Sequence, residues 1–227
     1  MQNNNVTKGL AFLFFAVSVM EIIGIAMNNS LIQSIFKPMM MLSLMALYYF
    51  SVEKRNNLYL LALAFSFLGD VFLLDKNSMF IFGIAAFLLT QLLYIYIIVK
   101  QMEKPSFFHK YLYAFLFANY IVYLMILLKP NLGDLFYPVV VYGVTIGVFG
   151  LVATLNYVTK RTKIDLVLML GAILFIASDS MIALNKFHEP RAFYPIAIMS
   201  TYILAQYLIF RFMVLKTNDR KEGSVLE

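Results

Sequence analysis

The chain has 227 residues, of which 62% are hydrophobic and only 13% charged, and its mean hydropathy is +0.81. Soluble globular domains are about half apolar and about a quarter charged, so this composition excludes an ordinary soluble domain and indicates a membrane protein. The absence of cysteine excludes disulfides, thiolate nucleophiles and zinc–thiolate sites, and a total of two histidines argues against a histidine metal centre.

Apolar runs of the length that spans a bilayer, about 20 residues, recur along the whole chain. They predict eight transmembrane helices, at residues 9–27, 36–52, 58–75, 79–99, 111–128, 136–157, 164–185 and 193–215. The first run resembles a signal peptide, but Glu21 interrupts it and no convincing cleavage site follows, so we interpret it as a membrane helix. The predicted fold is an all-α polytopic bundle, a single domain over residues 1–216 with a polar tail at 217–227.

The positive charges predict the orientation of this bundle. Thirteen of the 18 Lys and Arg residues lie near the two termini and in the loops after the second, fourth and sixth helices. Positive loops stay in the cytoplasm, which predicts cytoplasmic termini and an even number of spans. The orientation in the membrane thus explains the net charge of +6, and we expect no nucleic-acid partner. The expected location is the cell membrane, which for a bacterial protein is the inner membrane.

Three acidic residues, Glu21, Asp70 and Asp179, lie well inside predicted helices, away from their ends. An ionisable group there costs several kcal/mol and normally faces a bundle interior or a cavity. All three lie past the midpoint of helices that run outward from the cytoplasm. Each is followed seven residues later by a polar residue, about 10 Å further along the helix axis: Asn28, Asn77 and Lys186. This spacing predicts one polar pocket that opens to the outer leaflet.

Other polar side chains are candidates to line the same pocket: Lys37, Ser66, Gln91, Asn119, Lys186 and Gln206. The lysines, with Arg191, are placed at the outer entrance, where they could bind a phosphate group. The three amide side chains could instead form ordinary hydrogen bonds between helices. Glu21 could be a structural partner of a neighbouring helix, and Lys37 could be an anchor at a helix start.

Two pairs of segments four helices apart share part of their sequence. Residues 65–70 parallel residues 174–179, and residues 90–93 parallel residues 205–208. A parallel duplication of four helices would produce such a pattern, and so would chance similarity between apolar helices.

Four segments carry a family resemblance. Residues 65–74, FSFLGDVFLL, resemble the FSxxGDxxLL motif of the YhhN membrane family, whose characterised members are lysoplasmalogenases. Residues 171–187 are similar to its GAxLFxxSDxxLA element, residues 202–209 to YxxAQxLI and residues 37–39 approximately to KPL. The family often has Ala-His where this chain has Thr90-Gln91, so a role that needs an imidazole there cannot be filled.

The resemblance implies hydrolysis of the vinyl ether bond of lysoplasmalogens to a fatty aldehyde and glycerophosphocholine or glycerophosphoethanolamine. The partners would then be a lysophospholipid substrate and the membrane lipids. Vinyl ether hydrolysis begins with protonation of an alkene carbon to an oxocarbenium ion, which two carboxyl groups can promote, as they do in glycoside hydrolysis. We predict Asp70 and Asp179 as the catalytic pair, one protonated and the other ionised to orient water, without a metal or other cofactor.

A proton-coupled membrane transporter that uses the same buried acids is the alternative function. Transporter helices are typically interrupted by Gly or Pro near the binding site, whereas the glycines at 143, 147 and 150 lie in the sixth predicted helix, away from the acids. A purely structural membrane protein would leave the acids unexplained.

Overall fold

The computed structural model describes residues 4–75 and 78–225, which form eight α-helices and two short 3₁₀ helices, with no strand among them. The predicted all-α bundle is confirmed. The α-helices are α1 (Asn4–Ala26), α2 (Ser30–Ser51), α3 (Asn57–Phe72), α4 (Phe80–Val99), α5 (Phe107–Leu128), α6 (Phe136–Lys160), α7 (Lys163–Phe187) and α8 (Tyr194–Val225). Asn77, one of the residues used above to locate the interface, lies outside the described ranges.

Seven of these eight helices are long and apolar enough to cross a membrane. The exception is α3, whose 16 residues extend only about 24 Å at 1.5 Å per residue, compared with a hydrocarbon thickness of about 30 Å. The chain is therefore a multi-pass membrane protein. Because α3 is short and ends two residues after Asp70, this carboxyl group lies close to one end of the bundle.

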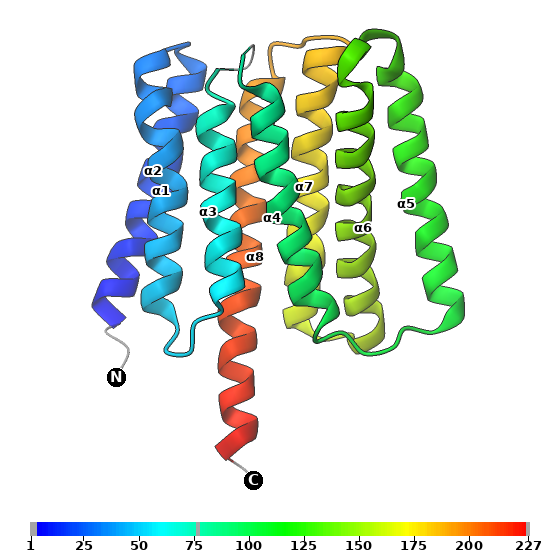
Figure 1. Cartoon of the computed structure of the whole chain (residues 1–227). Helices are drawn as coiled ribbons and strands as arrows, with labels where there is room; N and C mark the ends of the chain where they lie inside the picture. The colour runs from blue at the N-terminus through cyan, green and yellow to red at the C-terminus, as the bar shows by residue number, and fades with distance from the viewer. Residues whose placement is uncertain (1–3, 76–77, 226–227) are drawn as a thin grey trace.

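Both ends of the described chain lie at the same end of the bundle (Figure 1), which we call the terminal end. The loops that follow α2, α4 and α6 lie at this end as well, and the other loops lie at the opposite, distal end. The pattern of alternating loops agrees with the one used to count charges. The assignment of the terminal end to the cytoplasm stays a prediction.

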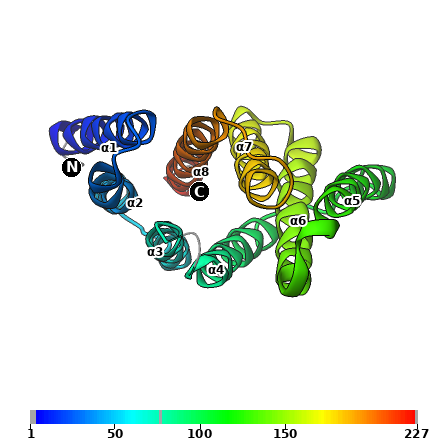
Figure 2. The same ribbon diagram turned by 90° about the horizontal axis from the view of Figure 1, so that it is seen from above.

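Seven helices form a ring, and α5 lies outside it (Figure 2). Each neighbouring pair around the ring is in contact, including α4 with α6 and α1 with α8, whereas α5 packs mainly against α6. Aromatic side chains fill the centre, where Phe87, Phe175 and Tyr202 pack edge to face with ring centroids 5.6–6.3 Å apart. Side chains that point into this ring are shielded from lipid by protein on every side.

Two helix boundaries differ most from the prediction. α2 begins at Ser30 rather than near Lys37, because the Asn29 side chain caps it by accepting hydrogen bonds from the amides of residues 31 and 32. Pro38 therefore lies inside α2, and Lys37 is not an anchor at a helix start. At the other end of the chain, the segment expected to be a separate polar tail continues α8 as far as Val225, while residues 226–227 lie outside the described ranges.

Candidate active site

Asp70 is held near the distal end by groups from three helices, and only 2% of its surface is exposed. Tyr202 of α8 donates a hydrogen bond of 2.9 Å to its Oδ2, and the Lys37 ammonium of α2 lies 4.0 Å from its Oδ1. Gly69 allows α3 to approach α4 closely, because a Cβ at this position would lie 2.6 Å from the ring of Phe87. The carboxyl group is thus fixed between a phenol and an ammonium.

A hydrogen-bonded chain behind Asp70 sets the direction of the Tyr202 hydroxyl. Tyr94 donates to Gln206 Oε1 at 2.9 Å, which leaves Nε2 of Gln206 to donate to the Tyr202 hydroxyl at 3.2 Å and to Ser66 Oγ at 3.1 Å. The Tyr202 oxygen accepts from this amide, so its own proton is directed to the carboxyl oxygen. Along this chain of hydrogen bonds, the amide of Gln206, the phenol of Tyr202 and the carboxyl group of Asp70 follow one another.

The same order of groups surrounds Asp179 of α7. Tyr142 of α6 donates a short hydrogen bond to Asp179 Oδ2, and Gln91 Nε2 of α4 lies 3.3 Å from the Tyr142 hydroxyl and 3.4 Å from the same carboxyl oxygen. Gln91 Oε1 is buried and has no hydrogen-bond partner in the described ranges. A buried acceptor of this kind is suited to bind a water molecule or a substrate hydroxyl.

The two arrangements are crossed between the parallel sequence segments. Gln206 in the C-terminal half of the chain supports Asp70 in the N-terminal half, and Gln91 in the N-terminal half supports Asp179 in the C-terminal half. The similarity seen in the sequence thus corresponds to one shared site inside the ring.

Two adjoining cavities lie near these groups: Asp179 lines the smaller one directly, whereas Asp70 lines neither and is linked to the larger one through Lys37. The larger one, which we call the distal cavity, has a volume of about 410 Å³ and contains the polar side chains of Glu21, Gln33, Lys37, Asn185 and Lys186 in its wall. Glu21 is 1% exposed, and the Lys186 ammonium lies 4.6 Å from the ring centroid of Phe80. Two lysines from opposite sides of the ring therefore face one cavity at the distal end.

The smaller cavity, which we call the aspartate cavity, has a volume of about 40 Å³ and is lined by Asp179, Tyr142 and apolar side chains. Leu73, Phe80 and Ile182 belong to the walls of both cavities, so the two are neighbours separated only by these side chains. A cavity of this volume has room for a water molecule, which needs about 10–15 Å³. The site thus has a cationic chamber beside a narrow, mostly apolar one.

The structure brings all but one of the predicted site residues together. Asp70, Asp179, Ser66, Gln91 and Gln206 belong to the hydrogen-bonded groups inside the ring, while Glu21, Lys37 and Lys186 line the distal cavity. Asn119 is exposed on α5 and donates to the Phe115 carbonyl of its own helix at 2.7 Å. It does not line the pocket, because α5 lies outside the ring. Arg191 pairs with Glu189 at 2.9 Å.

The sequence did not single out the two tyrosines that contact the aspartates. Tyr202 lies one turn before Gln206, and this spacing on a spanning helix was the available signal. Tyr142 lies in an almost uniformly apolar helix, where no periodicity marks the side that faces the interior.

Comparison with known proteins identifies the family. The model of the YhhN family matches residues 32–213, which covers seven of the eight helices and both aspartates. The chain belongs to the YhhN family. Among curated proteins, Lysoplasmalogenase TMEM86A of Bos taurus is 35% identical over 158 residues. This match covers 65% of the chain and 61% of the bovine protein, so the chain spans less than two thirds of that relative's length. No solved structure matches the chain.

Proposed function

We propose that this protein is a membrane-embedded lysoplasmalogenase, which hydrolyses the vinyl ether bond of a lysophospholipid to a fatty aldehyde and a glycerophospho-base. The observation that carries the proposal is the repeated order of amide, phenol and carboxyl around Asp70 and Asp179, next to a cavity with two lysines. The name of the bovine relative supports the same reaction. In this proposal the substrate is drawn from the surrounding cell membrane.

The two cavities suit the two ends of such a substrate. The phosphate of the head group would bind Lys37 and Lys186 in the distal cavity, since ammonium groups donate charge-assisted hydrogen bonds to phosphate oxygens. The first carbons of the alkenyl chain would pass Leu73, Phe80 and Ile182 to reach the aspartate cavity, whose volume of about 40 Å³ has room for the reacting atoms and not for the whole chain. This placement puts the vinyl ether, which joins the glycerol to the chain, beside Asp179.

The surroundings of the two carboxyl groups suggest different proton states. Asp70 lies 4.0 Å from the Lys37 ammonium, and a neighbouring cation favours the ionised form. Asp179 lines a mostly apolar cavity, which disfavours a charge. We therefore assign Asp179 as the general acid and Asp70 as the carboxylate that stabilises positive charge in the transition state.

The reaction then proceeds in three steps. Asp179 transfers its proton to the alkene carbon C2, which consumes the π bond and leaves an oxocarbenium ion at C1. A water molecule adds to C1 and returns one proton to Asp179, which gives a hemiacetal. The C1–O bond to glycerol breaks as the glycerol oxygen takes the hydroxyl proton, so one water is consumed and the acid is regenerated. Gln91 Oε1, the buried acceptor beside Asp179, is suited to hold the attacking water.

Incubation of the purified full chain with a lysoplasmalogen tests this function. We expect stoichiometric release of fatty aldehyde and glycerophospho-base, with no release of fatty acid from the matching acyl lysophospholipid, because an ester calls for a nucleophile rather than carbon protonation. Proton-driven lipid movement without aldehyde would instead identify the transporter and refute the enzyme.

A further inference from the structure

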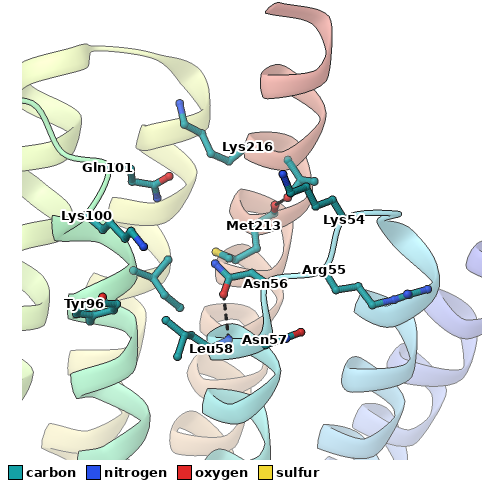
Figure 3. A pocket seen from close by; sticks show the side chains of 12 residues that line it. Lys54, Arg55, Asn56, Asn57, Leu58, Tyr96, Lys100, Gln101, Met213 and Lys216 are labelled. Atoms are coloured by element: carbon teal, nitrogen blue, oxygen red, sulfur yellow. Dashed lines mark hydrogen bonds between the residues drawn. The ribbon is translucent and has the colours of Figure 1, made fainter. Parts of the chain in front are cut away.

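A second large cavity lies at the terminal end of the bundle, opposite the distal cavity. It has a volume of about 620 Å³ and is bounded by the loop between α2 and α3, the end of α4 and the C-terminal part of α8 (Figure 3). Ligand sites in proteins commonly have volumes of about 300–1,000 Å³. The reaction proposed above uses no residue of this cavity.

Three lysines from three separate elements surround this cavity, and no acidic side chain lines it: Lys54, Lys100 and Lys216 (Figure 3). Lys216 also lies 3.5 Å from Asp219, which is outside the lining. Arg55 does not contribute its charge in the same way. Its Nε donates to the Tyr49 carbonyl at 3.0 Å and its guanidinium lies 3.6 Å above the Tyr49 ring. Four cationic side chains therefore line the cavity, and the three lysines are the ones not held against Tyr49.

Uncharged donors and a helix terminus add to this positive character. The N-terminal residues of α3 line the cavity, and the positive end of a helix dipole favours an anion. Asn56 caps this helix through its Oδ1, which accepts from the Leu58 amide at 3.0 Å (Figure 3). Its Nδ2 group and the side-chain amides of Asn57 and Gln101 supply further donors in the wall.

The deeper part of the lining is apolar and reaches the surface that faces the membrane. Leu58, Ile97 and Met213 belong to it, as does Tyr96, which is 54% exposed on α4. A small inorganic anion would contact the lysines alone, whereas a phospholipid offers a phosphate to the lysines and a glycerol backbone to the apolar part. We propose that this cavity binds the phosphate head group of an anionic membrane lipid.

Native mass spectrometry of the purified full chain with phosphatidylglycerol, and with phosphatidylcholine as the zwitterionic comparison, tests the proposal. We expect one phosphatidylglycerol to bind at least tenfold more tightly than phosphatidylcholine. The triple variant Lys54→Gln, Lys100→Gln, Lys216→Gln should lose most of this preference. A control triple variant, Lys104→Gln, Lys110→Gln, Lys163→Gln, removes the same charge from exposed positions at the same end and should keep it.

The outcomes separate the sources of the anion. Equal losses in the two triple variants would show that only the total charge of the terminal end matters, and would overturn the proposal. Displacement of phosphatidylglycerol by inorganic phosphate or glycerol 3-phosphate at an equal concentration would also overturn it, in favour of a soluble phosphate compound. Unchanged elution of both variants in size-exclusion chromatography ensures that folded proteins are compared.

Discussion

Helix α7 contains two buried aspartates, and their surroundings are opposite in kind. Asp165, in the first turn, is 0% exposed and its partners are close in sequence. Asn156 donates to its Oδ1 at 2.7 Å and Thr162 to its Oδ2 at 2.5 Å, while the Asp165 amide donates back to Thr162. Asp179, near the other end, receives its hydrogen bonds from α4 and α6 and lines a cavity.

This difference shows that burial alone does not mark a carboxylate as functional. Asp165 completes a helix N-terminus, and each of its oxygens is satisfied by a local donor. The hydrogen bonds of Asp179 within the described ranges all end on Oδ2, and its side chain lines the aspartate cavity. We therefore expect variants of the two residues to fail in different assays.

The largest effect is expected for Asp179→Asn. The amide has almost the same shape but cannot deliver a proton to carbon, and loss of a general acid costs about 10²–10⁴-fold in rate. Aldehyde release measured with a lysoplasmalogen at saturating concentration should fall by at least about 100-fold. A variant that keeps more than a tenth of the wild-type rate would remove Asp179 from the role of acid.

Tyr142→Phe should have the next largest effect. It deletes the hydroxyl that orients Asp179, and a hydrogen bond between uncharged groups contributes about 0.5–1.5 kcal/mol, so kcat should fall by up to about tenfold. The matched control is Tyr120→Phe, which deletes a hydroxyl that forms a 2.6 Å hydrogen bond with Ser180, the residue after Asp179. Equal losses of kcat in both variants would mean that Tyr142 has only a structural role.

A smaller effect, on KM rather than kcat, is expected for Lys186→Gln. The lysine is exposed at the distal cavity, where an ion pair with phosphate is worth about 1 kcal/mol, which corresponds to a rise in KM of about fivefold. Arg191→Gln is the control, because Arg191 lies at the same end and lines neither cavity. A rise in KM of the same size for both would place the phosphate elsewhere.

The smallest effect on activity is expected for Asp165→Asn. The new amide group replaces an acceptor with a donor opposite Thr162 or Asn156, which should lower the free energy of unfolding by about 1–2 kcal/mol. Thermal unfolding should reveal this loss, while kcat of the folded protein stays within about twofold of wild type, since Asp165 has no contact with the cavities. A hundredfold loss of kcat would end the distinction between the two aspartates.

The sequence predicted the fold well because hydropathy directly encodes membrane spans. It also drew attention to Asp70 and Asp179, since acids stand out in apolar helices, and their catalytic role stays a prediction. The start of α2 was missed because the helix accommodates Pro38, and Asn119 was misplaced because hydropathy gives no information on which helix lies outside the ring. The role of Tyr142 depends on the rotation of α6 about its axis, which is set by packing.

The most direct test of carbon protonation by a buried acid is the isotopic content of the product. Purified protein is incubated with a lysoplasmalogen in D₂O, and the aldehyde is trapped at once and analysed by mass spectrometry. We predict one deuterium at C2 of every aldehyde molecule, with a rate lower than in H₂O, and loss of product in both Asp70→Asn and Asp179→Asn. Aldehyde without deuterium at C2, or full activity in either variant, would contradict the proposed mechanism.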